Sequence, residues 1–399
     1  MAETPGALDG IRVLDLASGS FGYAGRLLAG YGAEVVKVEP PEGDILRSWP
    51  PFANDEPHPE RSVRHLHLSA GKRGITVDLE REQGRALLRR LVAEADVVLE
   101  SFTPGYLARL RLSYDDLLEV RPDLVMASIT HFGQDGPYAD YEGAEIVSVA
   151  LGGYLKLTGD RDREPVKPYD DLVQGQAALH ATMAVVTGIF HRDLTGEGDH
   201  FDVAAIDAAL FLLGGPAQTY YFDGEVTQRN STRLLNPNPL FPYPSTLRPC
   251  KDGYIHAHQN YGHPDLLAVL MEDPTLDDLM ETPMGNADQI DEKMDVWLAN
   301  HDKFEVVRLA QALRLPFTEV MTPLETLNDP HLAERGFFLD VEHPEAGTVR
   351  QPGAAAFMSA TPWKGGRAPL LGEHTDEVLG EWLGLDGVEI VALREQGAI

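Results

Sequence analysis

Cysteine is almost absent from this chain of 399 residues, in which Cys250 is the single thiol. One thiol excludes an intrachain disulfide and any metal site built from several cysteines. No apolar run approaches the roughly 18 residues that a membrane-spanning helix needs. The first residues, Met1-Ala-Glu-Thr-Pro-Gly6, are polar and do not resemble a signal peptide. We therefore expect a cytoplasmic protein with no membrane partner.

Positive charge is also scarce, because 33 Lys and Arg residues stand against 63 Asp and Glu residues, for a formal net charge of −30. Nucleic-acid binding requires a basic footprint, so we expect no nucleic-acid partner. The acidity does not exclude a small anionic ligand, since a local basic patch can lie within an acidic field. The length of the chain and its 43% of apolar residues allow two domains with a substantial core.

Residues 11–39 carry the clearest structural pattern. A short apolar run at 11–16 is typical of a buried parallel strand, and the Ser and Gly residues of 18–22 predict a turn. A short helix follows, Gly32 ends it, and 35–38 begin a second strand. The first loop of such a strand–helix–strand unit lies where open α/β sheets bind ligands. The glycines of this loop lack the Gly-x-Gly-x-x-Gly spacing, which argues against a dinucleotide-dependent dehydrogenase.

Alternating strands and helices continue along the chain and predict a parallel sheet with right-handed crossovers. The composition changes near residue 230, where the four prolines within 235–244 predict a linker or an extended crossover. We expect a large domain from 1–224, a smaller domain at 225–325, and a C-terminal segment, 326–399, that returns to the large domain. The expected strands are 76–79, 96–100, 124–129, 201–203 and 253–258, and the expected helices are 80–95, 114–121, 172–192, 204–213, 264–272, 287–300, 303–313 and 375–384.

Asp171 is the main candidate for chemistry, because it stands at the end of an extended segment and directly before the long helix expected at 172–192. From position alone, the favoured interpretation is a helix N-cap, in which the carboxylate accepts N–H bonds and complements the helix dipole. The other interpretation is a reactive carboxylate. Local sequence leaves both open.

Ordered segments of the chain resemble the class III CoA-transferases, a family that also contains formyl-CoA and carnitine CoA-transferases and the α-methylacyl-CoA racemases. The resemblance covers roughly 1–205 and 315–385, and the middle of the chain matches least. It implies a Rossmann-like α/β large domain with an inserted smaller α+β domain, and an interlocked homodimer. The segments that carry it are Gly10-Ile-Arg-Val-Leu-Asp-Leu16, 28–39, 43–47, 165–175, His191-Arg-Asp-Leu-Thr-Gly-Glu-Gly198, 322–336, Ser359-Ala-Thr-Pro362 and 368–375.

The resemblance identifies Asp171, rather than Asp170, as the transferase nucleophile, and Glu145 as an acidic residue near it. A carboxylate that attacks a thioester gives a mixed anhydride and CoA thiolate. Return of the thiolate gives an aspartyl-CoA thioester, from which an acceptor acid takes the CoA. The N–H groups of the following helix are expected to face a developing oxyanion. We expect acyl-CoA and a carboxylic acid as substrates, with no metal and no tightly bound cofactor. A solvated or ion-paired surface residue is the structural alternative for Glu145.

The same resemblance suggests which residues bind CoA. Lys72 and Arg73 supply cations for phosphate, although a Lys-Arg pair in a turn is commonly just solvated. Pro40 stands where the family often has an arginine, Ser101 replaces an Asn, and His131 replaces a Gly; we assign His131 a structural role. The full set of expected CoA-binding residues is Ser18, Gly19, Ser20, Lys72, Arg73, Ser101, Phe102 and Arg109.

Two other functions stay open at this stage. The racemases of the family carry a catalytic His where this chain has Ala144, so the paired bases of an α-methylacyl-CoA epimerase are not both visible and transferase is favoured. A non-catalytic CoA-binding subunit is the second alternative. The sequence does not name the acids, but aromatic residues in three loops suggest room for an apolar or aromatic acyl group, unless they belong to the core. These residues are Phe21, Tyr23, Tyr220, Tyr221 and Phe241.

Overall fold

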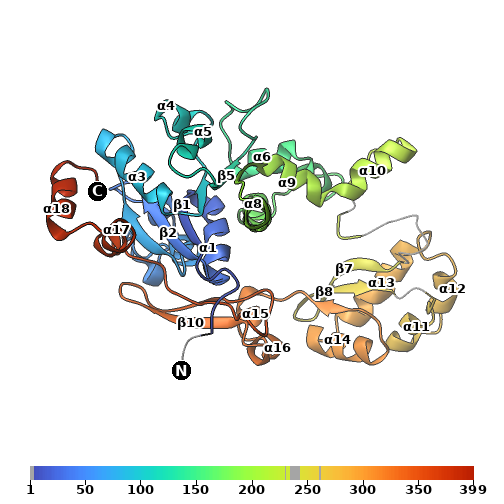
Figure 1. Ribbon diagram of the computed structural model, residues 1–399. Coiled ribbons are helices and arrows are strands. Elements are labelled where there is room, and N and C mark those ends of the chain that lie inside the picture. The colour runs from blue at the N-terminus through green and yellow to red at the C-terminus, as the bar shows by residue number, and fades with distance from the viewer. Residues whose placement is uncertain (1–3, 230, 234–242, 260–261) are drawn as a thin grey trace. The chain divides into compact units, whose positions relative to one another are not determined.

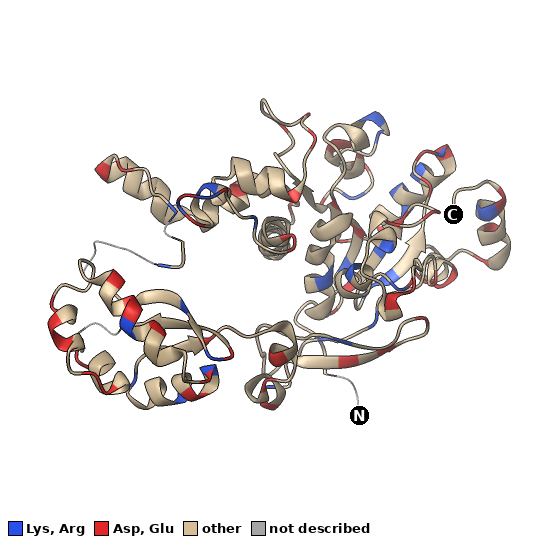
Figure 2. Ribbon diagram, turned by 180° about the vertical axis from the view of Figure 1, so that it is seen from behind, with Lys and Arg blue, Asp and Glu red and all other residues tan. Residues whose placement is uncertain are grey.

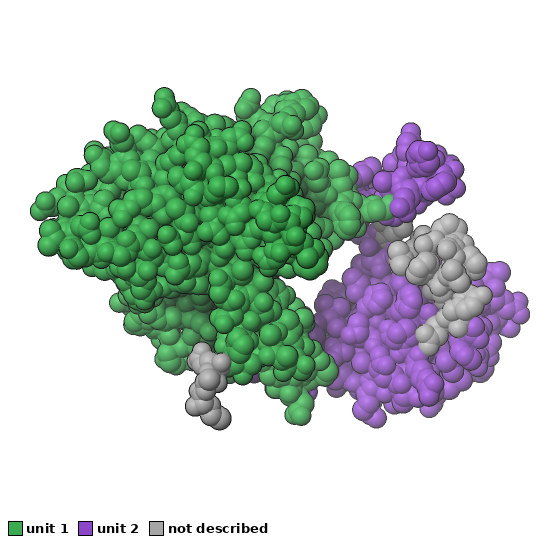
Figure 3. Space-filling view, viewed as in Figure 1, with its two compact units in different colours: residues 1–154, 168–214, 331–399 green, residues 155–167, 215–330 purple. Residues whose placement is uncertain are grey.

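The computed structural model describes residues 4–229, 231–233, 243–259 and 262–399 (Figure 1). Most of the expected crossover at 235–244, including Phe241, lies outside these residues. The chain forms two compact units (Figure 3), of which unit 1 comprises Met1–Tyr154, Pro168–Gly214 and His331–Ile399, and unit 2 comprises Leu155–Lys167 and Gly215–Pro330. The sequence analysis placed the corresponding divisions after 224 and 325.

Unit 1 is built on a sheet of six parallel strands in the order β3-β2-β1-β4-β5-β6. The predicted parallel α/β sheet is therefore confirmed. The strand order reverses between β1 and β4, which creates the crevice where open α/β sheets bind ligands. The strands are β1 (Arg12–Leu16), β2 (Glu34–Glu39), β3 (Arg73–Thr76), β4 (Val97–Glu100), β5 (Val125–Thr130) and β6 (Asp199–Ala204).

The strand expected at 76–79 lies earlier, at 73–76. Residues 76–79 alternate in polarity as a strand does, and Val77 and Leu79 are buried. The backbone nevertheless leaves the sheet after Val77, because the N–H of Asp78 donates to the carbonyl of Ala398 at 2.9 Å. A contact with the end of the chain thus replaces the strand that the local pattern predicts.

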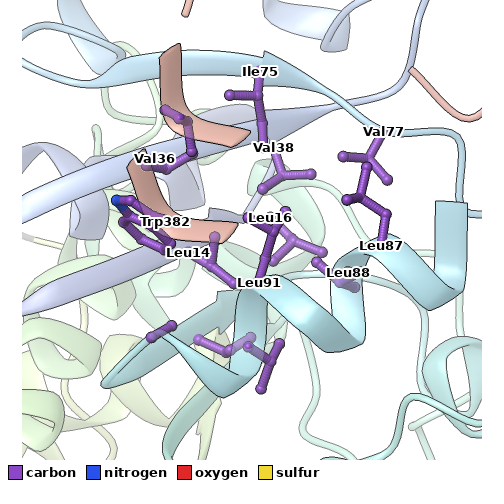
Figure 4. Close-up of a cluster of buried hydrophobic side chains, with 14 of the residues drawn as sticks. Leu14, Leu16, Val36, Val38, Ile75, Val77, Leu87, Leu88, Leu91 and Trp382 are labelled. Carbon is purple, nitrogen blue, oxygen red and sulfur yellow. The ribbon is translucent and has the colours of Figure 1, made fainter. Parts of the chain in front are cut away.

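Helices cover both faces of the sheet (Figure 1). The helices α1 (Tyr23–Gly30) and α8 (Leu172–Thr195) pack on one face, and α3 (Glu82–Ala93) and α17 (Thr375–Leu383) pack on the other. Figure 4 shows the core on the second face, where leucines of α3 and Trp382 of α17 meet the apolar side chains of β1, β2 and β3. The helix α17 of the C-terminal segment is thus part of the core that the first strands begin.

Shorter elements connect this framework. The other helices that belong wholly or partly to unit 1 are η1 (Gly19–Gly22), η2 (Ile45–Ser48), η3 (Ala53–Asp55), α2 (Val63–Leu68), α4 (Tyr106–Arg109), α5 (Tyr114–Leu118), α6 (Glu145–Leu151), α7 (Tyr154–Leu157), α9 (Ala205–Leu212), α10 (Gly214–Asp223), α16 (Pro330–Glu334) and α18 (Gly387–Glu395), and a hairpin pairs β10 (Phe338–His343) with β11 (Gly347–Pro352).

Unit 2 mixes helices with a small antiparallel sheet around its own apolar core. Within the described parts of both units, no helix has the length and apolar character that a membrane span needs. The sheet order is β7-β8-β9, and the elements are β7 (Ser245–Cys250), β8 (Gly253–His258), β9 (Thr318–Glu319), α11 (Leu266–Met271), α12 (Leu276–Met280), α13 (Ala287–Leu298), α14 (Lys303–Ala312) and α15 (Pro323–Leu327).

Candidate active site

The loops after β1 and β4 meet at the point where the strand order reverses. The N–H of Ser18, in the first loop, donates to Oγ of Ser101, in the second, at 2.8 Å. Gly19 begins η1 with φ of 59°, a left-handed conformation that glycine adopts without the strain of a Cβ. Ser20 follows it and is buried. The sheet therefore brings four of the predicted ligand-binding residues to one edge.

Asp171 lies beside this edge, at the N-terminus of α8. Its Oδ2 accepts hydrogen bonds from Oγ of Ser20 and from Nη1 of Arg64, both at 2.6 Å. Its side chain makes no capping bond to the helix. Of the residues that the structure describes, none donates a hydrogen bond to Oδ1. The N-cap interpretation therefore describes the position of Asp171 in the chain but not the contacts of its carboxylate.

Glu145 caps α8 instead. This buried side chain, on the first residue of α6, accepts the N–H of Val173 at 2.8 Å through Oε1 and the N–H of Gln174 at 3.0 Å through Oε2. A carboxylate at this place satisfies two N–H groups that the helix leaves without partners and complements the helix dipole. The expectation that these N–H groups face an oxyanion is corrected, because Glu145 occupies them.

Arg64, on α2, is the functional candidate that the sequence analysis missed. Its Nη1 contacts Oδ2 of Asp171, and its Nη2 contacts Oδ1 of Asp170 at 2.5 Å. Its guanidinium carbon lies 5.6 Å from the ring centre of Trp49. Partial burial lowers the pKa of Arg64, but the two carboxylates outweigh this and leave the pKa raised. No local sequence signal separates Arg64 from an ordinary exposed arginine, because its partners stand more than 100 positions later.

A cavity of about 410 Å³ opens above these groups. Its charged lining residues are Arg64, Asp170 and Asp171, and apolar and aromatic side chains make up much of the rest. His67 adds no charge, because burial and the charge of Arg26 lower its pKa to about 3. Tyr23 lines the cavity, and its contact with an acyl group stays a prediction. The apolar and aromatic lining is Tyr23, Val63, Leu68, Tyr169 and Leu172.

Two predicted phosphate ligands point elsewhere. The ammonium of Lys72 is fully buried, 2.6 Å from Oδ2 of Asp15 and 2.7 Å from the carbonyl of Gly22. It would have to leave both partners to reach a phosphate. Arg73 is the first residue of β3, which is the outermost strand on one side of the sheet. Its side chain forms ion pairs with three glutamates. These are Glu34, Glu377 and Glu381.

Next to Ser101, Phe102 and Arg109 pack on the ring of Tyr106 and form a partly exposed platform. The ring of Phe102 stacks on Tyr106 with 4.7 Å between ring centres, and the guanidinium carbon of Arg109 lies 5.1 Å from the centre of the Tyr106 ring. The side chain of Arg109 is 66% exposed and lies 3.8 Å from Glu80. A flat aromatic surface beside an exposed cation suits a nucleotide, which offers a planar base and phosphates.

His131 packs between two segments of the site, the first loop and α6. Its Nδ1 lies 2.8 Å from Oγ of Ser148 on α6, the helix that begins with Glu145, and its ring packs edge-on against Phe21. Burial lowers its pKa, and the charge of Asp171 opposes that shift. A Cβ on Gly143 would lie 2.2 Å from the His131 ring, so this glycine allows close packing. These contacts fit the structural role predicted for His131. Within the described residues, no group of His, Cys, Asp and Glu side chains is arranged to hold a metal ion.

Comparison with known proteins gives consistent results. The family model for CoA-transferase family III matches residues 8–375. The chain is 32% identical to the succinyl-CoA:(R)-benzylsuccinate CoA-transferase subunit BbsE of Thauera aromatica, over 97% of each chain. It is 30% identical to the succinyl-CoA–D-citramalate CoA-transferase of Chloroflexus aurantiacus, over 99% of this chain and 98% of the other. The crystal structure of a CAIB/BAIF family protein from Brucella suis aligns with a TM-score of 0.85 at 29% identity, over 95% of this chain and 100% of that one.

Proposed function

The chain belongs to CoA-transferase family III, whose members use CoA thioesters as substrates, and from this premise we propose that it moves CoA from an acyl-CoA to a carboxylic acid through a covalent intermediate on Asp171. The observation that carries the proposal is that two different carboxylates lie at the start of α8, one that caps the helix and one that faces the cavity. Glu145 satisfies the helix N–H groups, so that Asp171 keeps its carboxylate in the cavity.

The proposed reaction conserves atoms and charge at each step. An oxygen of Asp171 attacks the thioester carbon, the C–S bond breaks, and CoA leaves as thiolate while a mixed anhydride forms. The thiolate attacks Cγ of Asp171, the C–O bond breaks, and the donor acid leaves as carboxylate. The acceptor carboxylate then attacks the aspartyl-CoA thioester, and the same two steps in reverse yield the new acyl-CoA and the Asp171 carboxylate. Net proton transfer is not required.

Each residue near Asp171 takes a role from its contacts. Ser20 orients Oδ2 by its hydrogen bond, which leaves Oδ1 for attack on the thioester. Glu145 acts as a positioning residue; a direct catalytic contact stays a prediction. Ser18, Gly19 and Ser101 lie where the strand order reverses and are proposed to contact CoA, and the platform of Phe102 and Arg109 is proposed to hold the nucleotide end of CoA.

We further propose that the enzyme is an interlocked homodimer and that unit 2 corresponds to the smaller inserted domain expected at 225–325. The support for the dimer is the unusual exposure of apolar side chains along α8. Spacings of three, four and seven residues place these side chains along a single stripe. The exposed apolar residues of α8 are Leu172, Leu179, Met183, Val186, Phe190 and Leu194.

Covalent trapping tests the proposed function. The protein is incubated with a panel of acyl-CoAs that includes succinyl-CoA, treated with hydroxylamine, and analysed by peptide mass spectrometry. We expect a hydroxamate on Asp171 that is absent in Asp171→Asn. Asp170→Asn is the matched control, because it removes the neighbouring carboxylate and Asn tolerates the left-handed φ of 60° at that position. The adduct should persist in this control.

Failure of the trap would separate the alternatives. CoA binding without an adduct, combined with α-proton exchange of an acyl-CoA in deuterated water, would identify an epimerase. CoA binding with neither adduct nor exchange would identify a non-catalytic CoA-binding subunit.

A further inference from the structure

We propose that Arg64 is the carboxylate-exchange residue of this enzyme: it pairs with Asp171 in the resting state and binds the carboxylate of the acid substrate while Asp171 is a CoA thioester. The inference rests on the proposed function and deepens it, because it assigns the binding site of the acid substrate to a residue that nothing in the family resemblance marks.

The first step of the argument is charge. When Asp171 becomes a thioester it loses its negative charge, and the departing donor acid carries that charge away. Until an acceptor acid enters, Arg64 therefore lacks one of its two anionic partners. The anion that restores the pair is the carboxylate that must next attack Cγ of Asp171. Arg64 thus pairs with the Asp171 carboxylate in the resting enzyme and with the substrate carboxylate when the aspartyl-CoA enzyme has bound an acid.

The second step is geometry. Nη1 of Arg64 lies 2.6 Å from Oδ2 of Asp171, so a carboxylate held by Nη1 stands within reach of the same carbonyl group. Nη2 has a separate partner in Asp170, which keeps the guanidinium in place when Asp171 is neutral. The face of Trp49 supports the guanidinium from one side. A planar guanidinium presents its donors in the fork that fits a carboxylate.

The third step is the surrounding cavity. Val63, Leu68 and Leu172 line it, and an unpaired charge beside apolar walls is costly. Within this cavity Arg64 is the cationic side chain among the lining residues. The cavity therefore selects an acid whose carboxylate reaches Arg64 and whose remaining atoms contact apolar and aromatic groups.

The proposal makes unequal predictions for the two half-reactions. Arg64 stabilises both the resting Asp171 carboxylate and the transition state, so its loss changes the rate of thioester formation from acyl-CoA little. It does not stabilise the aspartyl-CoA enzyme before acid binds, so its loss slows capture by the acceptor. The equilibrium between enzyme plus acyl-CoA and aspartyl-CoA enzyme plus acid must shift toward the latter by the same factor.

The test measures both half-reactions by rapid quench and mass spectrometry, with succinyl-CoA as donor and succinate as acceptor, or with another reactive pair from the trapping panel. In Arg64→Gln we expect the rate of aspartyl-CoA formation to change less than about threefold, and the second-order rate constant for acceptor capture to fall by about 10- to 100-fold, the loss typical of one charge-assisted hydrogen-bonded pair. Arg64→Lys keeps the charge without the fork and should fall between wild type and Arg64→Gln. Arg61→Gln is the matched control, because Arg61 stands next to α2 but pairs with Glu56 outside the cavity.

A rescue experiment excludes a merely structural role. Guanidinium ion added to Arg64→Ala at millimolar concentration should accelerate acceptor capture without changing thioester formation. Equal losses in both half-reactions, or unchanged capture by folded Arg64→Gln or Arg64→Lys, would overturn the inference. If the wild-type protein itself forms no adduct, the proposed function has failed; if the adduct forms and the variants capture acceptor normally, only the role of Arg64 has failed.

Discussion

Carboxylates in unlike surroundings do different work in unit 1. Asp171 faces a cavity, with its Oδ2 held by a hydroxyl and a guanidinium. Glu145 is buried and bonded to helix N–H groups. Glu100, at the end of β4, is 3% exposed and accepts the N–H of Phe102 at 2.7 Å. Surroundings of this kind, rather than residue type, decide which carboxylate can attack, which positions the site and which holds a proton.

The helix cap can be tested by shortening Glu145. In Glu145→Ala the N–H groups of Val173 and Gln174 lose their acceptor, and we expect the free energy of unfolding to fall by about 2 kcal/mol. Asp171 is then the nearest carboxylate to the empty cap, so adduct formation should also fall, by about fivefold to tenfold. Glu145→Gln, which keeps one acceptor oxygen, should retain most of the adduct. Loss of the adduct in Glu145→Gln with an unchanged melting temperature would instead assign Glu145 a role in the chemistry.

Glu100 predicts a specific pH dependence of stability. Burial raises its pKa from 4.5 to about 7, although hydrogen bonds from Ser128 and the Phe102 N–H partly oppose this. Between pH 4.5 and 7 the folded protein holds a proton that the unfolded chain has lost, so its contribution to stability declines as the pH rises through this window. Glu100→Gln is neutral at every pH and should gain stability relative to wild type between pH 4.5 and pH 8, on the order of 3 kcal/mol.

Denaturant unfolding at pH 4.5 and pH 8 measures the difference in stability between Glu100→Gln and wild type. Glu82→Gln, on the exposed start of α3, controls for the removal of one negative charge. A stability difference between Glu100→Gln and wild type that is the same at both pH values would show that the pKa of Glu100 is not raised on folding.

At the scale of whole elements, α8 combines two functions. Its N-terminus carries Asp171, and its buried face packs on α1 and β5. Its other side carries the exposed apolar stripe, whose most exposed members are Phe190 and Leu194, at 66% and 70%. If the stripe is the interface of the proposed homodimer, assembly and the placement of the nucleophile depend on the same helix.

Phe190→Glu tests this interface. Burying a phenylalanine contributes about 2–3 kcal/mol, and burying an unpaired carboxylate instead adds a further cost, so the dissociation constant of the dimer should rise by at least about 100-fold. Val388→Glu on α18 is the matched control, because Val388 is a similarly exposed apolar residue outside the stripe. Sedimentation velocity at micromolar concentration reports the mass. A dimeric Phe190→Glu, or a monomeric wild type, would contradict the proposed interface.

The elements that sequence predicts well are those whose burial repeats with a local period. The helix expected at 80–95 is α3, at 82–93, and the helix expected at 172–192 is α8, at 172–195. β7 was missed because Pro249 argues against a strand, and the sheet tolerates it because β7 is an edge strand. The helix α18 was missed although Asp386 and Glu389 form a capping box at its start.

The site could be predicted only in part, because its key contacts are between distant residues. The motif around Asp171 identifies the carboxylate, but Arg64 reaches it from 107 positions earlier, and no local pattern encodes that pairing. Lys72 shows the converse. Its sequence position suits a phosphate ligand, whereas burial beside Asp15 gives its charge an internal partner. Partners of this kind follow from tertiary packing, which a single sequence does not reveal.

For the whole molecule, the excess of acidic groups is the dominant electrostatic property. Figure 2 shows Asp and Glu residues, in red, along helices of both units, with fewer Lys and Arg residues, in blue, among them. Some acidic groups are paired, as around Arg73, but 33 basic residues cannot neutralise 63 acidic ones. Mutual repulsion of like charges destabilises a compact state. The net negative charge therefore lowers the stability of the folded protein at neutral pH.

Salt should relieve this repulsion, since the screening length falls from about 10 Å at 0.1 M to about 3 Å at 1 M. At pH 7.5 we expect 0.5 M KCl to raise the melting temperature by a few degrees, corresponding to about 1–2 kcal/mol. Near pH 5, close to the sequence pI of about 4.7, the net charge is small and the remaining ion pairs are attractive. Screening then weakens attraction rather than repulsion, so the same salt should leave the melting temperature unchanged or lower it. Scanning calorimetry at the two pH values measures both effects, and an equal gain at pH 5 and pH 7.5 would mean that KCl stabilises the protein through hydration rather than through its charge.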